Sequence, residues 1–461
     1  MLLIETPDTR AAEREYVLGV VLGEFLGLRW RRISSERGDV RVTLDGMEGE
    51  LRLPDVLLSR PESDWLKPAS MPRQPLARWR LSKDQFEAKT VSDDLPIIYG
   101  DSAPSLRKEA NSLRLPIDIF GSAFFMLSRY EEMVTPDRDE QDRFPAWASL
   151  AHKEGFLDRP IVDEYIEVLW SAMSCLWPEL ARRQRHFRVQ VSHDVDHTSR
   201  YAFCGLRKMI RRVGGDVLLR QNYSALLNGP WTWLTTRDTL KASDPYNTFD
   251  WIMDRSEEND LKSAFYFMTG VTNPQREGDG DIDHPSTRDL IRRIHARGHE
   301  IGLHPSFETY LDPDQLRREA DKLRSVLDEE GVPSERLGGR MHYLRWRTPD
   351  TMRAWAQAGM VYDSTLGYAD QAGFRCGTCH EYPGFDIENG VACEIKIRPL
   401  IVMECSVFSP KYMSHSEAEG VVAIEKIRRL CEKFDGQFTL LWHNSEFTSK
   451  RSREQYVRLL K

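Results

Sequence analysis

The pattern of hydrophobic and polar positions changes character near residue 185. After that point, short apolar runs alternate with stretches in which apolar residues recur at helical spacing, which is typical of βα units. We expect strands at 187–193, 262–270, 299–304, 335–343 and 436–444. We expect helices between them at 248–261, 286–298, 312–331 and 348–359. In the last of these helices, Thr348 is expected as the N-cap and Pro349 as the first helical residue.

The first 185 residues follow a less regular pattern. Short alternating runs at 39–46 and 49–59 predict strands, and the amphipathic stretch 14–28 predicts a helix. Two further helices are expected at 115–133, with Asp118 near its start, and at 159–180. We therefore interpret 1–185 as a mixed α/β accessory domain and 186–461 as a second domain, with residues 198–245 inserted after its first strand.

Composition narrows the classes of function. The chain has 461 residues, of which 40% are hydrophobic, enough to build more than one core. Its net charge of -8 offers no basic surface for nucleic acid. We see no secretory signal and no apolar run of about 20 residues for a transmembrane segment, so we expect a cytoplasmic protein. The seven cysteines are an odd number and suggest reduced thiols.

Ionisable residues stand where the predicted strands end. In a barrel of parallel strands, the carboxyl ends meet at one mouth, and sites are built there. Several strands that each deliver such a residue are stronger evidence than any single one. The residues are Asp194, Asp196, His304, Arg340, His342 and His443.

The order of these motifs resembles polysaccharide deacetylases of carbohydrate esterase family 4, from about residue 186 to the end. The matching stretches are "SHDVD", "GHEIG" followed by "HPSFE", "GGRMHYLRW" and "LLWHN". The resemblance implies an α/β fold with a distorted (β/α) barrel and a divalent metal, usually zinc. The first half is similar, mainly through "DIFGSAFFMLSRYEE", to the accessory domain paired with such deacetylases in bacterial surface-polysaccharide loci.

The resemblance also implies a role for each matched residue. Asp194 corresponds to the general base and Asp196 to a metal ligand. His304 corresponds to a second ligand, Arg340 to the residue that orients the base, and His443 to the general acid. Such a set suits hydrolysis of an acetyl group, because the water must lose a proton and the leaving group must gain one.

The third metal ligand is left open by the sequence. The family has a second His four residues after the first, and this chain has Glu308 there. At that spacing Glu308 shares a helical face with His304. His342, at the end of the next strand, is the other candidate. Either choice gives nitrogen and oxygen ligands, which suit zinc.

Several further residues carry two interpretations each. Trp442, Asp363 and Tyr343 are candidates to contact a substrate, although Trp442 also suits core packing and Asp363 also suits a cap. Strand alternation turns His193 and His197 away from the two aspartates. The "CGTCH" stretch, with Cys376 and Cys379, suits a loop, a redox pair or a structural zinc site.

The leading hypothesis is a metal-dependent hydrolase that removes N- or O-linked acetyl groups from a sugar. Its substrate would be a cytoplasmic sugar or glycan intermediate of surface-polysaccharide synthesis. Two alternatives stay open. One is a cyclic amide hydrolase of the allantoinase type, and the other is a non-catalytic carbohydrate-binding or assembly protein with a degenerate site.

Overall fold

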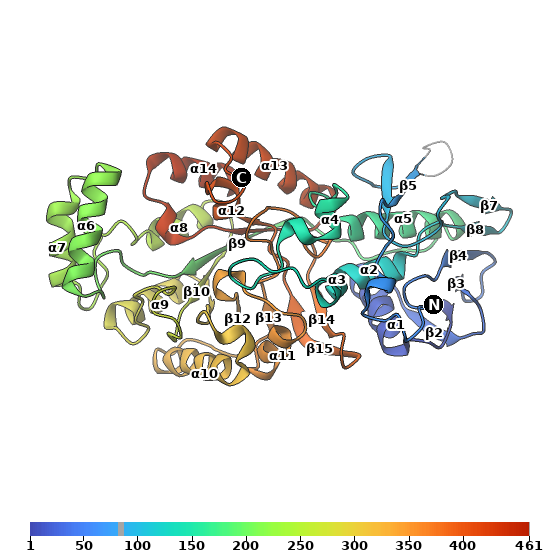
Figure 1. Ribbon diagram of the computed structural model, residues 1–461, viewed down its shortest axis with the longest axis horizontal. Coiled ribbons are helices and arrows are strands. Elements are labelled where there is room, and N and C mark those ends of the chain that lie inside the picture. The colour runs from blue at the N-terminus through green and yellow to red at the C-terminus, as the bar shows by residue number, and fades with distance from the viewer. Residues whose placement is uncertain (82–86, 461) are drawn as a thin grey trace. The chain divides into compact units, whose positions relative to one another are not determined.

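The computed structural model describes residues 1–81 and 87–460 and divides the chain into two compact units (Figure 1). The sequence predicted one boundary near 185, with everything after it in a single domain. The structure instead groups two later segments, Gly373–Ile401 and Lys426–Phe438, with Met1–Arg188. We call this group unit 1. The remainder forms unit 2, namely Val189–Ala372, Val402–Glu425 and Thr439–Lys461. Both contain helices and strands, so the mixed α/β class is confirmed.

Unit 1 contains a sheet with strand order β2-β1-β3-β4-β8-β7. Its strands bury alternate side chains, such as Leu2 and Ile4 of β1, because successive side chains point to opposite faces. The strand bounds are β1 Leu2–Thr6, β2 Trp30–Ser34, β3 Asp39–Leu44, β4 Glu50–Pro54, β7 Arg107–Glu109 and β8 Ser112–Arg114. Two antiparallel pairs lie outside this sheet, namely β5 Ala77–Arg80 with β6 Asp94–Ile97, and β14 Tyr382–Asp386 with β15 Val391–Ile397.

The helices of unit 1 include the long apolar ones that the sequence predicted. Asp118 caps the first of these, α2, because its carboxylate accepts a hydrogen bond from the Gly121 N–H at 2.8 Å. The predicted helix at 115–133 is divided, since Arg129 adopts a positive φ of 56° between α2 and α3. The bounds are α1 Ala11–Leu18, α2 Ile119–Leu127, α3 Tyr130–Val134, α4 Leu150–Lys153 and α5 Ile161–Leu176.

Unit 2 is built on parallel strands with order β13-β12-β11-β10-β9-β17-β16. All five residues of β10 are buried, as expected for a strand covered on both faces. The bounds are β9 Arg188–Val195, β10 Ser263–Phe267, β11 Glu300–Leu303, β12 Gly338–Gly339, β13 Tyr362–Asp363, β16 Val402–Met403 and β17 Gln437–Leu441. Each predicted strand after residue 186 is present, although β12 is much shorter than expected. A closed barrel stays a prediction.

The helices of unit 2 follow its strands, as the alternating pattern predicted. The amphipathic stretch 312–331 forms α10, capped by Asp312. The predicted cap of α11 is wrong: Pro349 is the N-cap residue, and the Thr348 hydroxyl instead accepts from Trp346 Nε1 at 3.1 Å. The bounds are α6 Leu206–Arg220, α7 Ala225–Thr235, α8 Phe249–Glu257, α9 Pro285–Ala296, α10 Pro313–Glu329, α11 Asp350–Gln357, α12 Glu404–Phe408, α13 Glu417–Lys433, which extends into unit 1, and α14 Lys450–Leu460.

Glycines allow β11, β12 and β13 to approach closely. A Cβ on Gly339 would lie 1.9 Å from the Leu303 carbonyl oxygen, and a Cβ on Gly302 would lie 2.5 Å from the Gly338 carbonyl oxygen. Only residues without a side chain fit there. This contact brings Arg340, which directly follows β12, next to the end of β11. Among the described residues, no helix is both long and apolar enough to cross a bilayer.

Candidate metal and acid-base site

Parallel strands of unit 2 deliver ionisable residues at their carboxyl ends. Asp194 is the second-to-last residue of β9, and Asp196 directly follows that strand. His304 follows β11, and Arg340 follows β12. Because β9, β10, β11 and β12 are successive parallel neighbours, their ends lie on one edge of the sheet.

Asp196, His304 and His342 form a group whose ligand-type atoms converge. One such atom from each residue lies within 4.8 Å of the others. Asp196 Oδ1 is 3.2 Å from His304 Nε2 and 3.4 Å from His342 Nε2. The facing atoms of Asp196 and His304 are buried without a hydrogen bond to any described residue. Buried polar atoms normally have a partner, so lone pairs directed at one point fit a bound cation.

The backbone sets the orientation of the His304 ring. Its Nδ1 lies 2.7 Å from the Arg340 carbonyl oxygen, which can only accept, so Nδ1 carries the proton. In the neutral ring, Nε2 then presents its lone pair to Asp196. This is the arrangement that a backbone carbonyl imposes on metal-binding histidines when it accepts from their other ring nitrogen.

The side chains of this group change one another's pKa. Burial alone would raise the pKa of Asp196, but the neighbouring side chains of His304 and His342 hold it well below the usual range. Burial would lower the pKa of His304, yet the carboxylates of Asp194 and Asp196 raise it. Burial dominates at His342 and lowers its pKa to about 4. The carboxylate is therefore kept charged while His342 is kept neutral, as metal ligands must be.

Asp194 and Arg340 form a buried ion pair beside this group. Arg340 Nη1 donates to Asp194 Oδ1 at 2.7 Å. Its Nη2 donates to the hydroxyls of Ser192 and Ser364 at 2.9 and 3.0 Å, and its Nε donates to the Ser364 carbonyl oxygen. These bonds fix the guanidinium, so the second carboxylate oxygen of Asp194 stays available to accept a proton.

His443 lies on the opposite side of Asp196, with Nε2 3.9 Å from Asp196 Oδ2. Its Nδ1 is hydrogen-bonded to the buried carboxylate of Glu404, which also accepts from the His443 backbone N–H at 2.9 Å. Burial alone would lower the pKa of His443, but the charge of Glu404 raises it well above the usual value. Our sequence interpretation missed Glu404. The available signal was its position directly after the apolar run 399–403.

Glu308, the other candidate for the third ligand, lies away from the group. Its half-exposed carboxylate pairs with Arg345 at 2.9 Å and contacts the Asn273 amide at 3.5 Å. Glu308 lies in the loop before a short 3-10 helix, not on a helix shared with His304, so the helical spacing invoked for it does not apply.

The three residues considered for substrate contact have different surroundings. Trp442 is buried and stacks on Phe447 with ring centroids 5.8 Å apart, so it belongs to the core. Asp363 is buried and caps the following turn, accepting from the Thr365 N–H at 2.8 Å. Tyr343 is the exposed one of the three, and its ring lies 4.6 Å from that of His342. Of these three residues, Tyr343 is therefore the one exposed beside the group.

The histidines that flank the two aspartates lie outside the group. His193 is fully buried, with Nδ1 2.6 Å from the Trp442 carbonyl oxygen and Nε2 3.2 Å from the Ser263 hydroxyl. Burial lowers its pKa to about 3. His197 Nδ1 accepts from the Asp279 N–H at 3.3 Å. Both rings have contacts of a structural kind, as strand alternation predicted.

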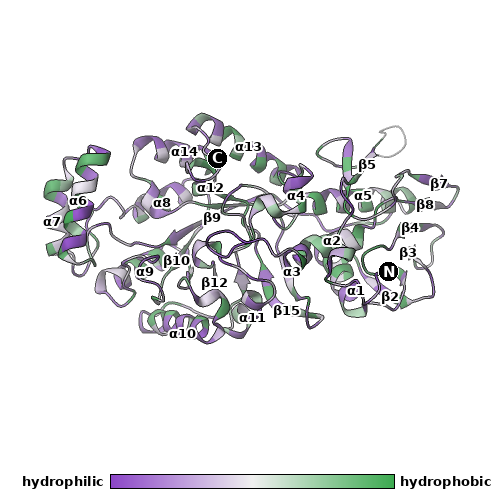
Figure 2. Cartoon of the chain, in the orientation of Figure 1, coloured by the Kyte–Doolittle hydropathy of each residue, from purple (hydrophilic) through white to green (hydrophobic). Residues whose placement is uncertain are grey.

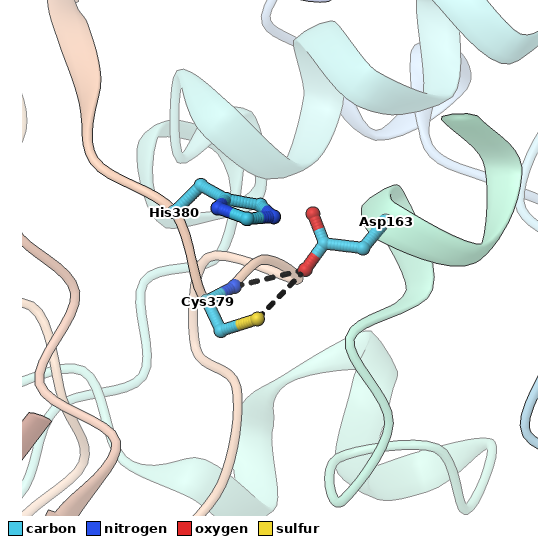
Figure 3. A group of neighbouring side chains, drawn as sticks. All are labelled: Asp163, Cys379 and His380. Carbon is cyan, nitrogen blue, oxygen red and sulfur yellow. Dashed lines mark hydrogen bonds between the residues drawn. The ribbon is translucent and has the colours of Figure 1, made fainter. Parts of the chain in front are cut away.

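A second group of ligand-type residues lies in unit 1, where Asp163 of α5 meets Cys379 and His380. Figure 3 shows the side chains of Cys379 and His380 pointing toward the Asp163 carboxylate. That carboxylate accepts from the Thr378 hydroxyl at 2.6 Å, and from the backbone N–H and thiol of Cys379 at 3.0 and 3.2 Å. The "CGTCH" stretch thus contributes Cys379 to a hydrogen-bonded cluster, while Cys376 is buried separately.

Residues 2–178 match a family model described as a family of unknown function, DUF7033. Among curated proteins, none matches the chain in sequence. Solved structures similar to the chain include three proteins, and each similarity covers 60% of it. A Mycobacterium smegmatis protein assigned to the polysaccharide deacetylases is 14% identical, with 83% of its own chain covered and a TM-score of 0.39. A polysaccharide deacetylase of Bacillus cereus is 10% identical (86% covered, TM-score 0.30), and the allantoinase PuuE is 13% identical (83% covered, TM-score 0.35).

Proposed function

We propose that the protein is a metal-dependent hydrolase that removes an acetyl group from an N- or O-acetylated sugar. One observation carries this proposal. The unpartnered lone pairs of Asp196 and His304, with His342, lie between a base held by an arginine and a histidine held by a carboxylate. A cation site flanked by one proton acceptor and one proton donor is what hydrolysis of an amide or ester requires.

Asp196, His304 and His342 would hold the metal. One carboxylate oxygen and two imidazole nitrogens form a donor set that suits zinc and leaves a coordination position open. When bound, such an ion polarises a carbonyl group and lowers the pKa of a water molecule. About a quarter (27%) of the Asp196 side chain is exposed, so the group is accessible to solvent.

Asp194 would accept the proton of the attacking water. Arg340 occupies one carboxylate oxygen through the 2.7 Å contact and keeps the group oriented. Arg340 is itself held at four hydrogen bonds, so Asp194 cannot rotate away without breaking a buried ion pair.

His443 would donate a proton to the leaving nitrogen or oxygen. Glu404 binds its Nδ1, which fixes the ring and favours the protonated form, so Nε2 carries the transferable proton. Nε2 is also the atom that faces Asp196, at 3.9 Å from Oδ2. Glu404 is thus a positioning residue, while Asp194 and His443 are opposed as acceptor and donor.

The proposal extends to the biological setting expected from the sequence resemblance. The substrate would be a sugar or glycan intermediate of surface-polysaccharide synthesis, handled in the cytoplasm, and unit 1 would act as an accessory domain. Tyr343, exposed beside His342, is the candidate to contact the sugar.

Acetate release tests this function. Purified full-length protein, loaded with zinc, is incubated with N-acetylated and O-acetylated oligosaccharides and, separately, with allantoin. We expect acetate from at least one sugar substrate, loss of that activity on chelation, and loss in Asp194→Asn. Ring opening of allantoin without acetate release would replace the deacetylase by a cyclic amide hydrolase. A protein that binds sugars but yields neither product would instead be a non-catalytic binding protein.

A further inference from the structure

Helices α6 and α7 of unit 2 form a hairpin with a strongly apolar outer surface. Leu218 and Leu219 at the end of α6 are 81% and 86% exposed, and Leu227 of α7 is 81% exposed. Figure 2 shows hydrophobic residues on both helices. We call the exposed large apolar side chains of this hairpin its apolar face: Leu206, Ile210, Leu218, Leu219, Tyr223, Leu226, Leu227, Trp231 and Leu234. Many exposed large apolar side chains gathered on one helical hairpin are typical of an interaction site.

The packing of the hairpin places its small residues inside and its large apolar residues outside. The buried residues of α7 are Ala225, Gly229 and Thr232, which recur at helical spacing. A Cβ on Gly229 would lie 2.3 Å from Val213 Cγ2 of α6, so the two helices approach too closely for a larger residue. A helix that only needed to pack on α6 would bury its leucines and expose polar residues. The leucines of α7 are instead exposed, where they can contact an apolar environment outside the protein.

Basic side chains border the apolar face. The sequence of α6 contains five basic residues and one acidic residue, and that of α7 contains no ionisable residue. Lys208 and Arg212 bind Asp279 at 2.5 and 2.6 Å and tie the hairpin to unit 2. Arg207 and Arg211, one helical turn apart, are exposed and form no ion pair with any residue that the structure describes. These two arginines are available to an anionic partner.

We propose that this hairpin inserts into the headgroup region of an anionic lipid bilayer. Exposed leucines would contact the acyl chains, Trp231 and Tyr223 would lie at the polar boundary, and Arg207 and Arg211 would contact lipid phosphates. With 15 and 11 residues, the helices are shorter than the roughly 20 residues that span a bilayer. They would therefore lie in the interface, buried by about 5–10 Å.

A second copy of the chain fits the hairpin less well. A two-fold contact places the same patch on both sides, so the apolar faces would meet together with their bordering arginines. Arg207 and Arg211 would then approach their own copies, because the one acidic residue of the two helices, Asp216, is buried and already paired with Arg200 and Arg220. An anionic membrane satisfies both the apolar and the basic parts of the surface.

Vesicle flotation of the full-length protein tests this proposal. The probes are vesicles of phosphatidylcholine alone and of phosphatidylcholine with phosphatidylglycerol. The wild type is expected to float with the anionic vesicles and much less with the neutral ones. The double variant Leu218→Gln/Leu219→Gln should bind at least about tenfold more weakly. Arg207→Gln/Arg211→Gln should lose the preference for anionic lipid.

The matched control changes two exposed apolar residues elsewhere in unit 2, Leu311→Gln/Val422→Gln, and should float like the wild type. Thermal melts of all variants check that each is folded. The proposal fails if the wild type does not bind anionic vesicles, or if the Leu218/Leu219 variant binds as well as the control. It also fails if light scattering shows a dimer that this variant breaks while vesicles capture neither protein.

Discussion

Two groups of ligand-type residues, Asp196–His304–His342 in unit 2 and Asp163–Cys379–His380 in unit 1, differ in what their donor atoms already bind. In unit 2, Asp196 Oδ1 and His304 Nε2 face each other without a hydrogen bond to any residue that the structure describes. In unit 1, the Asp163 carboxylate is occupied by three donors from Thr378 and Cys379. Clusters of the same residue types can therefore form a cation site in one place and a structural hydrogen-bonded cluster in another.

The pKa values of the two aspartates distinguish the groups in the same way. The pKa of Asp196 is held low by the neighbouring histidines, whereas burial raises the pKa of Asp163 to about 6. Burial, followed by the positive charge of Arg185, lowers the pKa of His380, and the same charge acts on Asp163, so unit 1 already has a cation nearby. A bound metal would complete the first group and would disturb the second.

The largest expected difference is in catalysis. Asp194→Asn removes the proton acceptor beside the unit 2 group, so kcat for acetate release should fall by about 10²–10⁴. Asp163→Asn in unit 1 should leave kcat within about twofold of the wild type, since neither its carboxylate nor its partners carry a proton in the proposed reaction. Steady-state kinetics of both variants decides this. Similar losses in the two would remove the functional distinction between the groups.

The second largest expected difference between the two groups is in metal content. Asp196→Ala removes the only carboxylate of the proposed donor set, so zinc retained after dialysis should fall to near zero. Asp163→Ala should retain as much zinc as the wild type, because its partners are hydrogen-bond donors. Elemental analysis of the dialysed proteins measures both. Loss of a zinc ion in Asp163→Ala would make unit 1 a metal site as well.

For the free energy of unfolding, the larger loss is expected from the substitution in unit 1. In metal-free protein, Asp163→Ala leaves the buried donors of Thr378 and Cys379 without an acceptor, and should lower the free energy of unfolding by about 1–3 kcal/mol. Asp196→Ala should cost less, since in the absence of a metal its Oδ1 makes no hydrogen bond. Urea denaturation in the presence of a chelator compares them. A greater loss in Asp196→Ala would contradict the structural role given to Asp163.

The smallest effect is in the pH dependence of stability. The folded-state pKa of Asp163, about 6, lies above the ordinary value of 3.8, so the folded protein binds this proton more tightly than the unfolded chain. Its contribution to stability is therefore present below pH 3.8 and is lost as the pH rises to 6. Urea midpoints of wild type and Asp163→Asn between pH 4 and 7 should differ by a pH-dependent amount that favours wild type at the acid end. A constant difference would rule out the raised pKa.

Local structure was largely predictable from the sequence, because periodicity and capping are local properties. The period of 3.6 in 312–331 predicted α10, and the apolar run 436–444 predicted β17. Asp118 could be recognised near the start of α2 for the same reason. The failure at Thr348 was also local, since its hydroxyl bonds to the Trp346 indole and not to the helix.

Residue types and local periodicity were enough to predict the available chemistry and its place at the strand ends. The residues that stand there are Asp194, Asp196, His304, Arg340 and His443. Which of their atoms meet, and which other residues join them, depended on how the chain folds. It brought His342 to Asp196 and left Glu308 with Arg345.

Further outcomes of the same kind depended on contacts between residues far apart in the chain. The structure placed Glu404 against His443, packed Trp442 against Phe408 and grouped Gly373–Ile401 with unit 1. It also left the leucines of α6 and α7 outside. Each outcome depends on distances between segments separated by tens to hundreds of residues, and no local periodicity encodes such distances.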